Sequence, residues 1–96
     1  MTFTWDPRKA ARNLKKHRVD FREAATVFDD LGSVAFPDAD HSWGEHRFVI
    51  IGRSARGRIL VVAYTEVGAT VLRIISARVA TSHERGFYEE DTATDR

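Results

Sequence analysis

The spacing of the hydrophobic residues changes near Gly32, and this change limits the folds that are open to the chain. Before Gly32, apolar residues follow the spacing of a buried helix face, as in Phe21, Ala24, Ala25 and Phe28. After it come three strand-like runs, at residues 46–53, 58–65 and 70–77. Short segments that contain glycine separate them. Helices followed by closely connected strands predict an α+β domain with a mainly antiparallel sheet.

Capping signals divide the first thirty residues into two helices. Asp6 before Pro7 predicts a helix start, because aspartate accepts hydrogen bonds from free backbone N–H groups and proline fits the first turn. This helix is expected to end near His17. Asp20 and Glu23 resemble a capping box at the start of a second helix. We expect both helices to cover one face of the sheet.

Shorter elements are predicted on either side of the three main strands. Residues 2–5 and 34–36 are expected to be short strands, the first of them at a sheet edge. Thr81 and Glu84 form another capping box, which predicts a last helix that runs to about Glu90.

The predicted architecture is a single α+β domain over residues 1–96, in which residues 91–96 form a frayed tail. Two N-terminal helices pack on a mainly antiparallel sheet of about four strands, and a C-terminal helix follows. The chain has no cysteine, which excludes disulfides and thiolate zinc sites. No apolar run approaches the ~20 residues that span a bilayer, and residues 1–6 do not have the pattern expected of a signal peptide. We therefore expect a cytoplasmic protein without a membrane partner.

The expected hairpin registers place two arginines among apolar residues on one face of the sheet. Two- or four-residue turns pair Arg53 with Arg58 and Thr65 with Thr70. The face that the helices cover then collects Phe48, Ile50, Ile59, Val61, Ala63, Leu72 and Ile74. The other face collects Arg47, Tyr64 and Arg73 with Val49, Ile51, Leu60, Val62, Val71 and Ile75. Because an unpaired buried charge is costly, the two arginines on this face need either an acidic partner or a phosphate.

Basic residues are concentrated at the N-terminal end of the chain. Residues 1–20 contain six basic and two acidic side chains, whereas residues 82–96 contain two basic and five acidic ones. The formal net charge of the whole chain is only +1. Such a local basic stretch can attract a polyanion, and it can equally be a solvated helix face.

Several short strings occur in the order and spacing of one known family. In the first half they are Trp5-Asp6-Pro7, Asn13-Leu14-Lys15-Lys16-His17 and Ala24-Ala25-Thr26-Val27-Phe28-Asp29-Asp30. In the second half they are Glu45-x-Arg47, Ile51-Gly52-Arg53-Ser54, Gly57-Arg58, Tyr64-Thr65-Glu66 and Arg73-Ile74-Ile75-Ser76-Ala77-Arg78. As an ordered set over roughly residues 3–90, they resemble the BrnT family of toxins from type II toxin–antitoxin systems.

This resemblance implies a compact α+β fold like that of RelE-type toxins and endoribonuclease activity that inhibits translation. It also implies a cognate BrnA antitoxin that binds both the toxin and operator DNA, so that DNA is a partner only through the antitoxin. Two features depart from the family pattern. Arg18 stands where the family often has a helix-ending glycine, and the last helix is poorer in arginine than in relatives.

RNA cleavage without a metal needs a base for the 2′-OH proton, a cation for the phosphate and an acid for the leaving 5′-oxygen. We expect no metal and no other cofactor. Arg73 is the first candidate for the cation, because a guanidinium grips phosphate with two hydrogen bonds; the alternative is an ion pair with Glu66 or another acid. Arg78 is a second candidate, since it lies beside the expected N-terminus of the last helix, which favours anions; the alternative is a structural role.

Three further residues are candidates for proton transfer. His17 can act as acid or base near neutral pH, or it can simply cap the end of its helix. Tyr64 can donate a proton or stack on a base, or it can pack within the sheet. Glu66 is a candidate general base, and otherwise the counter-ion of Arg73.

The first helix is predicted to track RNA phosphates. Lys9, Arg12 and Lys16 lie close to one outer face of that helix, and Arg47 adds a cation from the sheet. The alternative for the helix is a solubilising face. Two functions are therefore consistent with the sequence: an RNA-cleaving toxin, or a non-catalytic nucleic-acid-binding or protein-interaction module whose basic helix does the binding.

A polar loop between the second helix and the main strands contains residues that resemble metal ligands. They are Asp38, Asp40, His41, Glu45 and His46. Their spacing matches no closed metal site, and we interpret them as turn residues. Glu45 is also a candidate counter-ion for the sheet arginines. Trp43 indicates either a contact surface or a side chain folded over the core.

Overall fold

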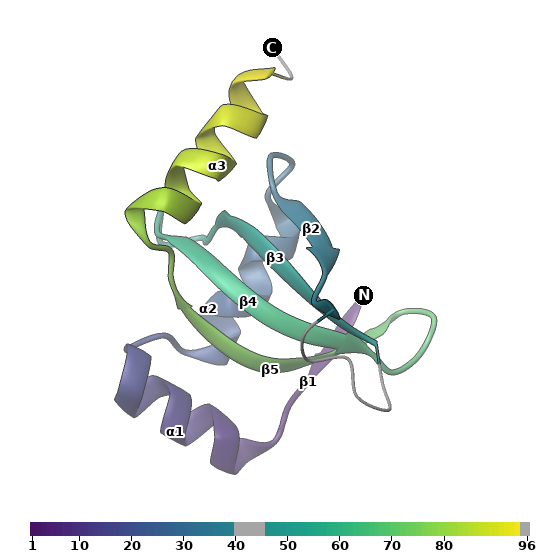
Figure 1. The fold of residues 1–96 in the computed structure, drawn as a ribbon. Helices are drawn as coiled ribbons and strands as arrows, with labels where there is room; N and C mark the ends of the chain where they lie inside the picture. The colour runs from purple at the N-terminus through teal and green to yellow at the C-terminus, as the bar shows by residue number, and fades with distance from the viewer. Residues whose placement is uncertain (40–45, 95–96) are drawn as a thin grey trace.

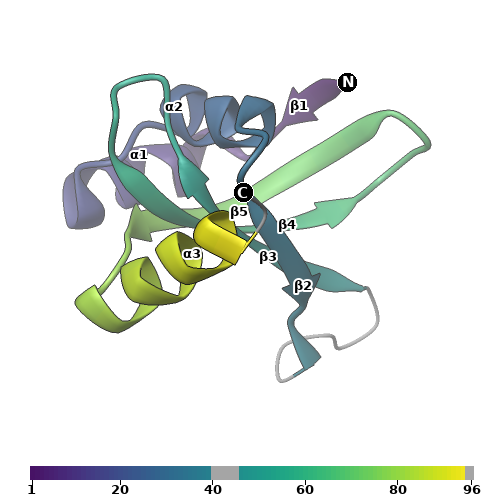
Figure 2. The same cartoon turned by 90° about the horizontal axis from the view of Figure 1, so that it is seen from above.

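The computed structural model describes residues 1–39 and 46–94, which form one five-stranded mixed sheet with helices on both faces (Figure 1; Figure 2). The strands are β1 (Thr2–Thr4), β2 (Val34–Pro37), β3 (Arg47–Arg53), β4 (Ile59–Glu66) and β5 (Val71–Val79). The helices are α1 (Pro7–His17), α2 (Phe21–Thr26), the short 3₁₀ helix η1 (Val27–Asp29) and α3 (Ser82–Thr94). The strand order is β1-β5-β4-β3-β2.

The α+β architecture and the helix starts are confirmed, and the strand count is corrected. The sheet has five strands rather than about four, because both predicted short segments join it at opposite edges. β1 pairs in parallel with β5, whereas all other neighbouring strands are antiparallel. Asp6 and Asp20 cap α1 and α2 through hydrogen bonds from the backbone N–H groups of Arg8 and Arg22, each 2.8 Å long. α3 continues to Thr94, beyond the expected end near Glu90.

The predicted grouping of residues on the two faces of the sheet was wrong for β4. Both hairpins have three-residue loops, closed by the pairs Ser54–Arg58 and Val67–Val71, instead of two- or four-residue turns. Each odd-length loop shifts the register by one residue, and a one-residue shift turns every side chain to the opposite face. Because the two shifts cancel, the side chains of β3 and β5 lie on the predicted faces, whereas those of β4 lie on the faces opposite to the predicted ones. Leu60, Val62 and Tyr64 therefore lie on the helix-covered face, and Ile59, Val61 and Ala63 lie on the other.

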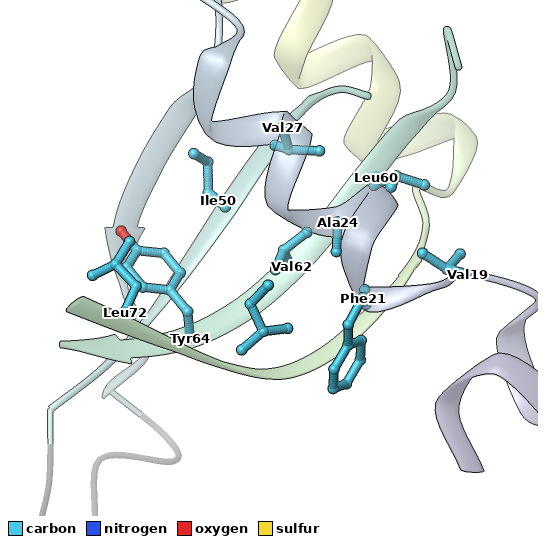
Figure 3. Packing of buried hydrophobic residues seen from close by; sticks show 11 residues of the cluster. Val19, Phe21, Ala24, Val27, Ile50, Leu60, Val62, Tyr64 and Leu72 are labelled. Carbon is cyan, nitrogen blue, oxygen red and sulfur yellow. The ribbon is translucent and has the colours of Figure 1, made fainter. Parts of the chain in front are cut away.

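The main core lies between the sheet and α2, where Figure 3 shows its buried side chains. From the helical segment it receives Val19, Phe21, Ala24 and Val27, and from the sheet Ile50, Leu60, Val62, Tyr64, Leu72, Ile74 and Ala77. A smaller cluster lies on the opposite face, between the sheet and α3. It consists of Ile51, Ile59 and Val61 from the sheet, Ala80 from the segment after β5, and Tyr88 from α3. α3 thus covers only one end of the second face (Figure 2), and Arg73, near the start of β5, is exposed.

Glu23 joins α2 to the β3–β4 hairpin and does not close the capping box expected for it. Its side chain is buried and accepts hydrogen bonds from Ser54 Oγ at 2.7 Å and from the Arg58 guanidinium, with Nε at 3.0 Å. These hydrogen bonds hold the pKa of Glu23 below its ordinary value, although burial opposes the shift, and the hydrogen bond from Arg58 contributes most. The ion pair therefore fixes the hairpin against the helix layer.

Arg18 ends α1 in the left-handed conformation that the family pattern assigns to glycine. Its φ is 59°, and its backbone N–H donates to Leu14 O at 2.9 Å, as in a helix C-cap. The Arg58 guanidinium donates to the carbonyl of Arg18 at 3.0 Å, so the turn is held from the sheet side. Arg18 thus ends the helix in a left-handed conformation although it is not glycine.

α3 is attached to the body through its first turn and through Tyr88. The Thr81–Glu84 capping box forms as predicted, with Thr81 N donating to Glu84 Oε1 at 2.9 Å and Glu84 N donating to Thr81 Oγ1 at 3.2 Å. Tyr88 donates to Asp30 Oδ2 at 2.6 Å, which links α3 to the segment after η1. In the described part of the chain, no helix combines the length and apolar character needed to cross a membrane.

Candidate functional site

α1 continues along the sheet edge that β1 leaves uncovered. β1 pairs only with Val71, Leu72 and Arg73, after which β5 has a register shift around Ile75. Beyond the shift, the buried side chain of Asn13 takes the place of a neighbouring strand: Nδ2 donates to Ala77 O at 2.8 Å, and Oδ1 accepts from Ala77 N at 3.1 Å. α1 is therefore held parallel to the β5 edge, with its basic side chains beside the strand.

A first cavity of about 220 Å³ lies where β1 turns into α1. It is lined by Asp6, Lys9, Arg47, Arg73, Ile74 and Ile75. The sheet register explains how two distant arginines meet there: Thr65 of β4 pairs with Arg47 on one side and Arg73 on the other, so all three lie in one row across the sheet. The predicted co-location of Arg47 and Arg73 on one face is confirmed.

A second cavity, of about 380 Å³, lies nearer the end of α1. It is lined by Lys9, Arg12, Asn13, Lys16, His17, Ile75 and Ser76. Lys9 and Ile75 line both cavities, so the two are adjacent, and together we call them the α1–β5 groove. Five basic side chains line it, together with His17 and the carboxyl group of Asp6. A groove with this charge attracts a polyanion.

His17 and Arg73 lie in different parts of the groove. Arg73 lines the cavity at the start of α1, whereas His17 lines the cavity at its end. α1 is 11 residues long, so at ~1.5 Å per residue its ends are about 15 Å apart. His17 is therefore placed to contact a polyanion in the same groove but at a different phosphate from Arg73.

Tyr64 and Glu66 lie on the face of the sheet opposite the two arginines. Tyr64 is only 8% exposed and packs against Phe28 and Phe48, with ring centroids 4.9 Å and 5.6 Å away. Burial, reinforced by the charge of Glu66, raises the pKa of the Tyr64 phenol. Glu66 is exposed and pairs with Leu72, so the register puts it on the side of Tyr64. The structure does not bring these two residues into the groove.

Arg78 lies on the arginine face but at its other end, under α3. Its guanidinium makes a two-pronged ion pair with Glu84, with Nη1–Oε1 at 2.7 Å and Nη2–Oε2 at 2.8 Å. This pairing is the main reason that the pKa of Glu84 falls to about 2. Arg78 thus holds the first turn of α3 to the sheet, and both prongs of its guanidinium are occupied by a carboxylate.

Sequence reasoning missed three residues of the site. Asp6 is interpreted from the sequence as a helix cap and Ile75 as one apolar residue in a strand, and Asn13 receives no individual role. Only the return of β5 beside α1 places them in the groove. Of the loop residues considered as metal ligands or contacts, Asp40, His41, Trp43 and Glu45 lie outside the described residues.

The fold is similar to that of a known toxin. The crystal structure of the Brucella abortus ribonuclease toxin BrnT, determined at 1.1 Å resolution, matches this chain with a TM-score of 0.67 and 28% sequence identity. The match covers 85% of this chain and 99% of the Brucella chain. No curated protein sequence matches this chain.

The family model described as "Ribonuclease toxin, BrnT, of type II toxin-antitoxin system" matches residues 5–84, which include every residue of the groove. The chain belongs to the BrnT family of ribonuclease toxins. As a member of a type II toxin–antitoxin family, it has RNA as the substrate class and an antitoxin as the partner class.

Proposed function

We propose that this protein is a metal-independent endoribonuclease that binds RNA in the α1–β5 groove and inhibits translation in the cytoplasm. The observation that carries the proposal is the convergence of five basic side chains from α1, β3 and β5 on one groove. Lys9, Arg12 and Lys16 contact successive phosphates along α1. Arg73, with Arg47 beside it, grips the scissile phosphate, since a guanidinium matches phosphate geometry and stays charged.

The cleavage chemistry of the proposal has a direct test. Purified protein, incubated with single-stranded RNA in excess EDTA, is expected to cleave and to leave 2′,3′-cyclic phosphate and 5′-OH ends, because the 2′-oxygen is the nucleophile. The measurement is end-group analysis of the fragments by mass spectrometry. Loss of cleavage on chelation, restored by Mg²⁺ or Zn²⁺, would contradict the metal-independent mechanism. Binding of RNA without any cleavage would instead favour a non-catalytic binding module.

We propose a BrnA-like protein as the cognate antitoxin, with operator DNA bound only through it. A groove that attracts RNA phosphates also attracts acidic side chains, and a protein segment seated there excludes RNA. One surface then serves both substrate binding and inhibition.

Replacing Lys9, Arg12 and Lys16 together by alanine is expected to weaken RNA binding and to flatten its salt dependence. Each lost phosphate contact on single-stranded RNA should lower the slope of log K against log [salt] by about 0.7, so the total change is about 2. The same variant should bind a BrnA-like antitoxin more weakly. Fluorescence anisotropy with labelled RNA, over a range of salt concentrations, measures both the affinity and the slope.

The matched control is a double replacement on the same helix. Arg8 and Lys15 are also exposed bases of α1, but neither lines the two cavities of the groove. Their replacement by alanine should change the slope far less than the triple replacement does. Equal effects of the two variants would mean that α1 attracts RNA only through its overall charge.

A further inference from the structure

We propose that Asp6 is the general base of the cleavage reaction, an inference that rests on the ribonuclease function proposed above. The groove supplies cations for the phosphate, but the reaction also needs a group that removes the 2′-OH proton. Among the described residues that line the Arg73 cavity, Asp6 is the one that carries a carboxyl group. It is also the residue at which β1 turns into α1, beside the strand that carries Arg73.

The side chain of Asp6 is held in place and remains accessible to substrate. Its Oδ1 accepts a hydrogen bond from Arg8 N at 2.8 Å, which fixes the orientation of the carboxylate at the start of α1. A carboxylate has about four acceptor positions, so one capping bond leaves capacity for a substrate hydroxyl. Asp6 is exposed, and Lys9 and Arg73 line the same cavity. A base and a phosphate-binding cation therefore share one small space.

The other candidate bases lie away from that space. A general base must come within about 3 Å of the proton-bearing oxygen, and the 2′-oxygen adjoins the phosphate that it attacks. His17 is at the far end of α1, about 15 Å from Asp6. Glu66 is on the opposite side of the sheet, with Tyr64 and Leu72. If Arg73 grips the scissile phosphate, Asp6 is in reach of the adjacent 2′-OH and these two residues are not.

The step is a transesterification within the RNA. The 2′-oxygen attacks phosphorus while its proton passes to the Asp6 carboxylate, and the P–O5′ bond breaks. The 5′-oxygen leaves as a hydroxyl group with a proton from solvent water, and Asp6 returns its proton to the hydroxide that this water leaves behind. The products are a 2′,3′-cyclic phosphate and a 5′-OH. Arg73 stabilises the charge that builds on the phosphate oxygens.

The test replaces Asp6 by asparagine. Asparagine caps a helix as well as aspartate does, so α1 and the thermal stability should be retained while the base is lost. We expect Asp6→Asn to lower kcat for RNA cleavage about 10²–10⁴-fold with little change in KM. Asp6→Ser, which also keeps the cap, should behave in the same way. Melting temperatures, recorded in parallel, confirm that each variant is folded.

The chain contains a matched control for the capping role. Asp20 caps α2 with the same geometry, through a 2.8 Å hydrogen bond from Arg22 N, and it lines neither cavity of the groove. Asp20→Asn should leave the cleavage rate unchanged. A loss of rate equal to that of Asp6→Asn would overturn the proposal, because loss of a carboxylate at a helix cap outside the groove would then have the same effect.

Two outcomes distinguish a failure of the Asp6 assignment from a failure of the proposed function. Normal cleavage by Asp6→Asn, with Arg73→Lys impaired, would overturn the Asp6 assignment and leave the ribonuclease proposal standing. An unmodified protein that does not cleave RNA would overturn both.

Discussion

Arg73→Lys is expected to slow RNA cleavage by one to three powers of ten, which corresponds to roughly 1.4–4 kcal/mol of transition-state stabilisation. Lysine keeps the positive charge but loses the planar fork that grips phosphate through two hydrogen bonds. Arg73 is exposed on β5, so the melting temperature should change by only a few degrees. Single-turnover cleavage of a short RNA measures the chemical step directly.

The control for Arg73→Lys is Arg22→Lys. Arg22 is an arginine on α2 with 84% of its side chain exposed, and it lines neither cavity of the groove. Its replacement should leave the rate within about twofold of that of the unmodified protein. If Arg73→Lys also cleaves at that rate, Arg73 has a structural role, and the grip on the phosphate passes to Arg47 and Lys9 in the same cavity.

Glu23→Ala is expected to be the most destabilising replacement of a charged residue, at about 3 kcal/mol. The change leaves the Arg58 guanidinium and the Ser54 hydroxyl without their acceptor beneath the hairpin. Glu23 is 7% exposed, so water cannot fully replace the lost partner. Urea unfolding at pH 7 measures the effect as a lower midpoint with an unchanged m-value.

The effect of Glu23→Ala should depend on pH in a defined direction. Because the folded state lowers the pKa of Glu23, its ion pair stabilises the protein above the ordinary pKa of 4.5 and loses this effect as the pH falls through the lowered value. The difference in unfolding free energy between the two proteins should therefore shrink below about pH 4.5. Glu66→Ala, at an exposed position, should change stability by less than about 0.5 kcal/mol at any of these pH values. A difference that grows on acidification would contradict the assignment.

Local signals in the sequence predicted the helix starts correctly, because the interactions that make them are local. Asp6, Asp20 and the Thr81–Glu84 box each act within one helical turn, and each caps its helix in the structure. The predicted register of the β3–β4 hairpin was wrong, and part of what holds its three-residue loop comes from another layer of the fold. Ser54 Oγ accepts from the backbone N–H groups of Arg56 and Arg58 and donates to Glu23 of α2, a contact that the local sequence does not reveal.

The sequence predicts part of the lining of the groove. Lys9, Arg12, Lys16, Arg47 and Arg73 are its candidate phosphate-binding cations, and the fold collects all five in one groove. Arg78 looks the same in the sequence, but its partner Glu84 becomes apparent only when α3 returns to the sheet. Asp6 was not predicted as a site residue, because its role as a helix cap already explains an aspartate before Pro7 in the sequence.

The parallel pairing of β1 with β5 determines when this groove can form during synthesis. Thr4 pairs with Arg73, so the chain must be made from the first strand to the last before the two walls of the groove can meet. Pairing between such distant segments is slow compared with the closing of a hairpin. A nascent chain that ends before β5 has α1 but lacks Arg73 and the edge to which Asn13 binds. A ribosome that makes this protein therefore carries no assembled groove until β5 has been made.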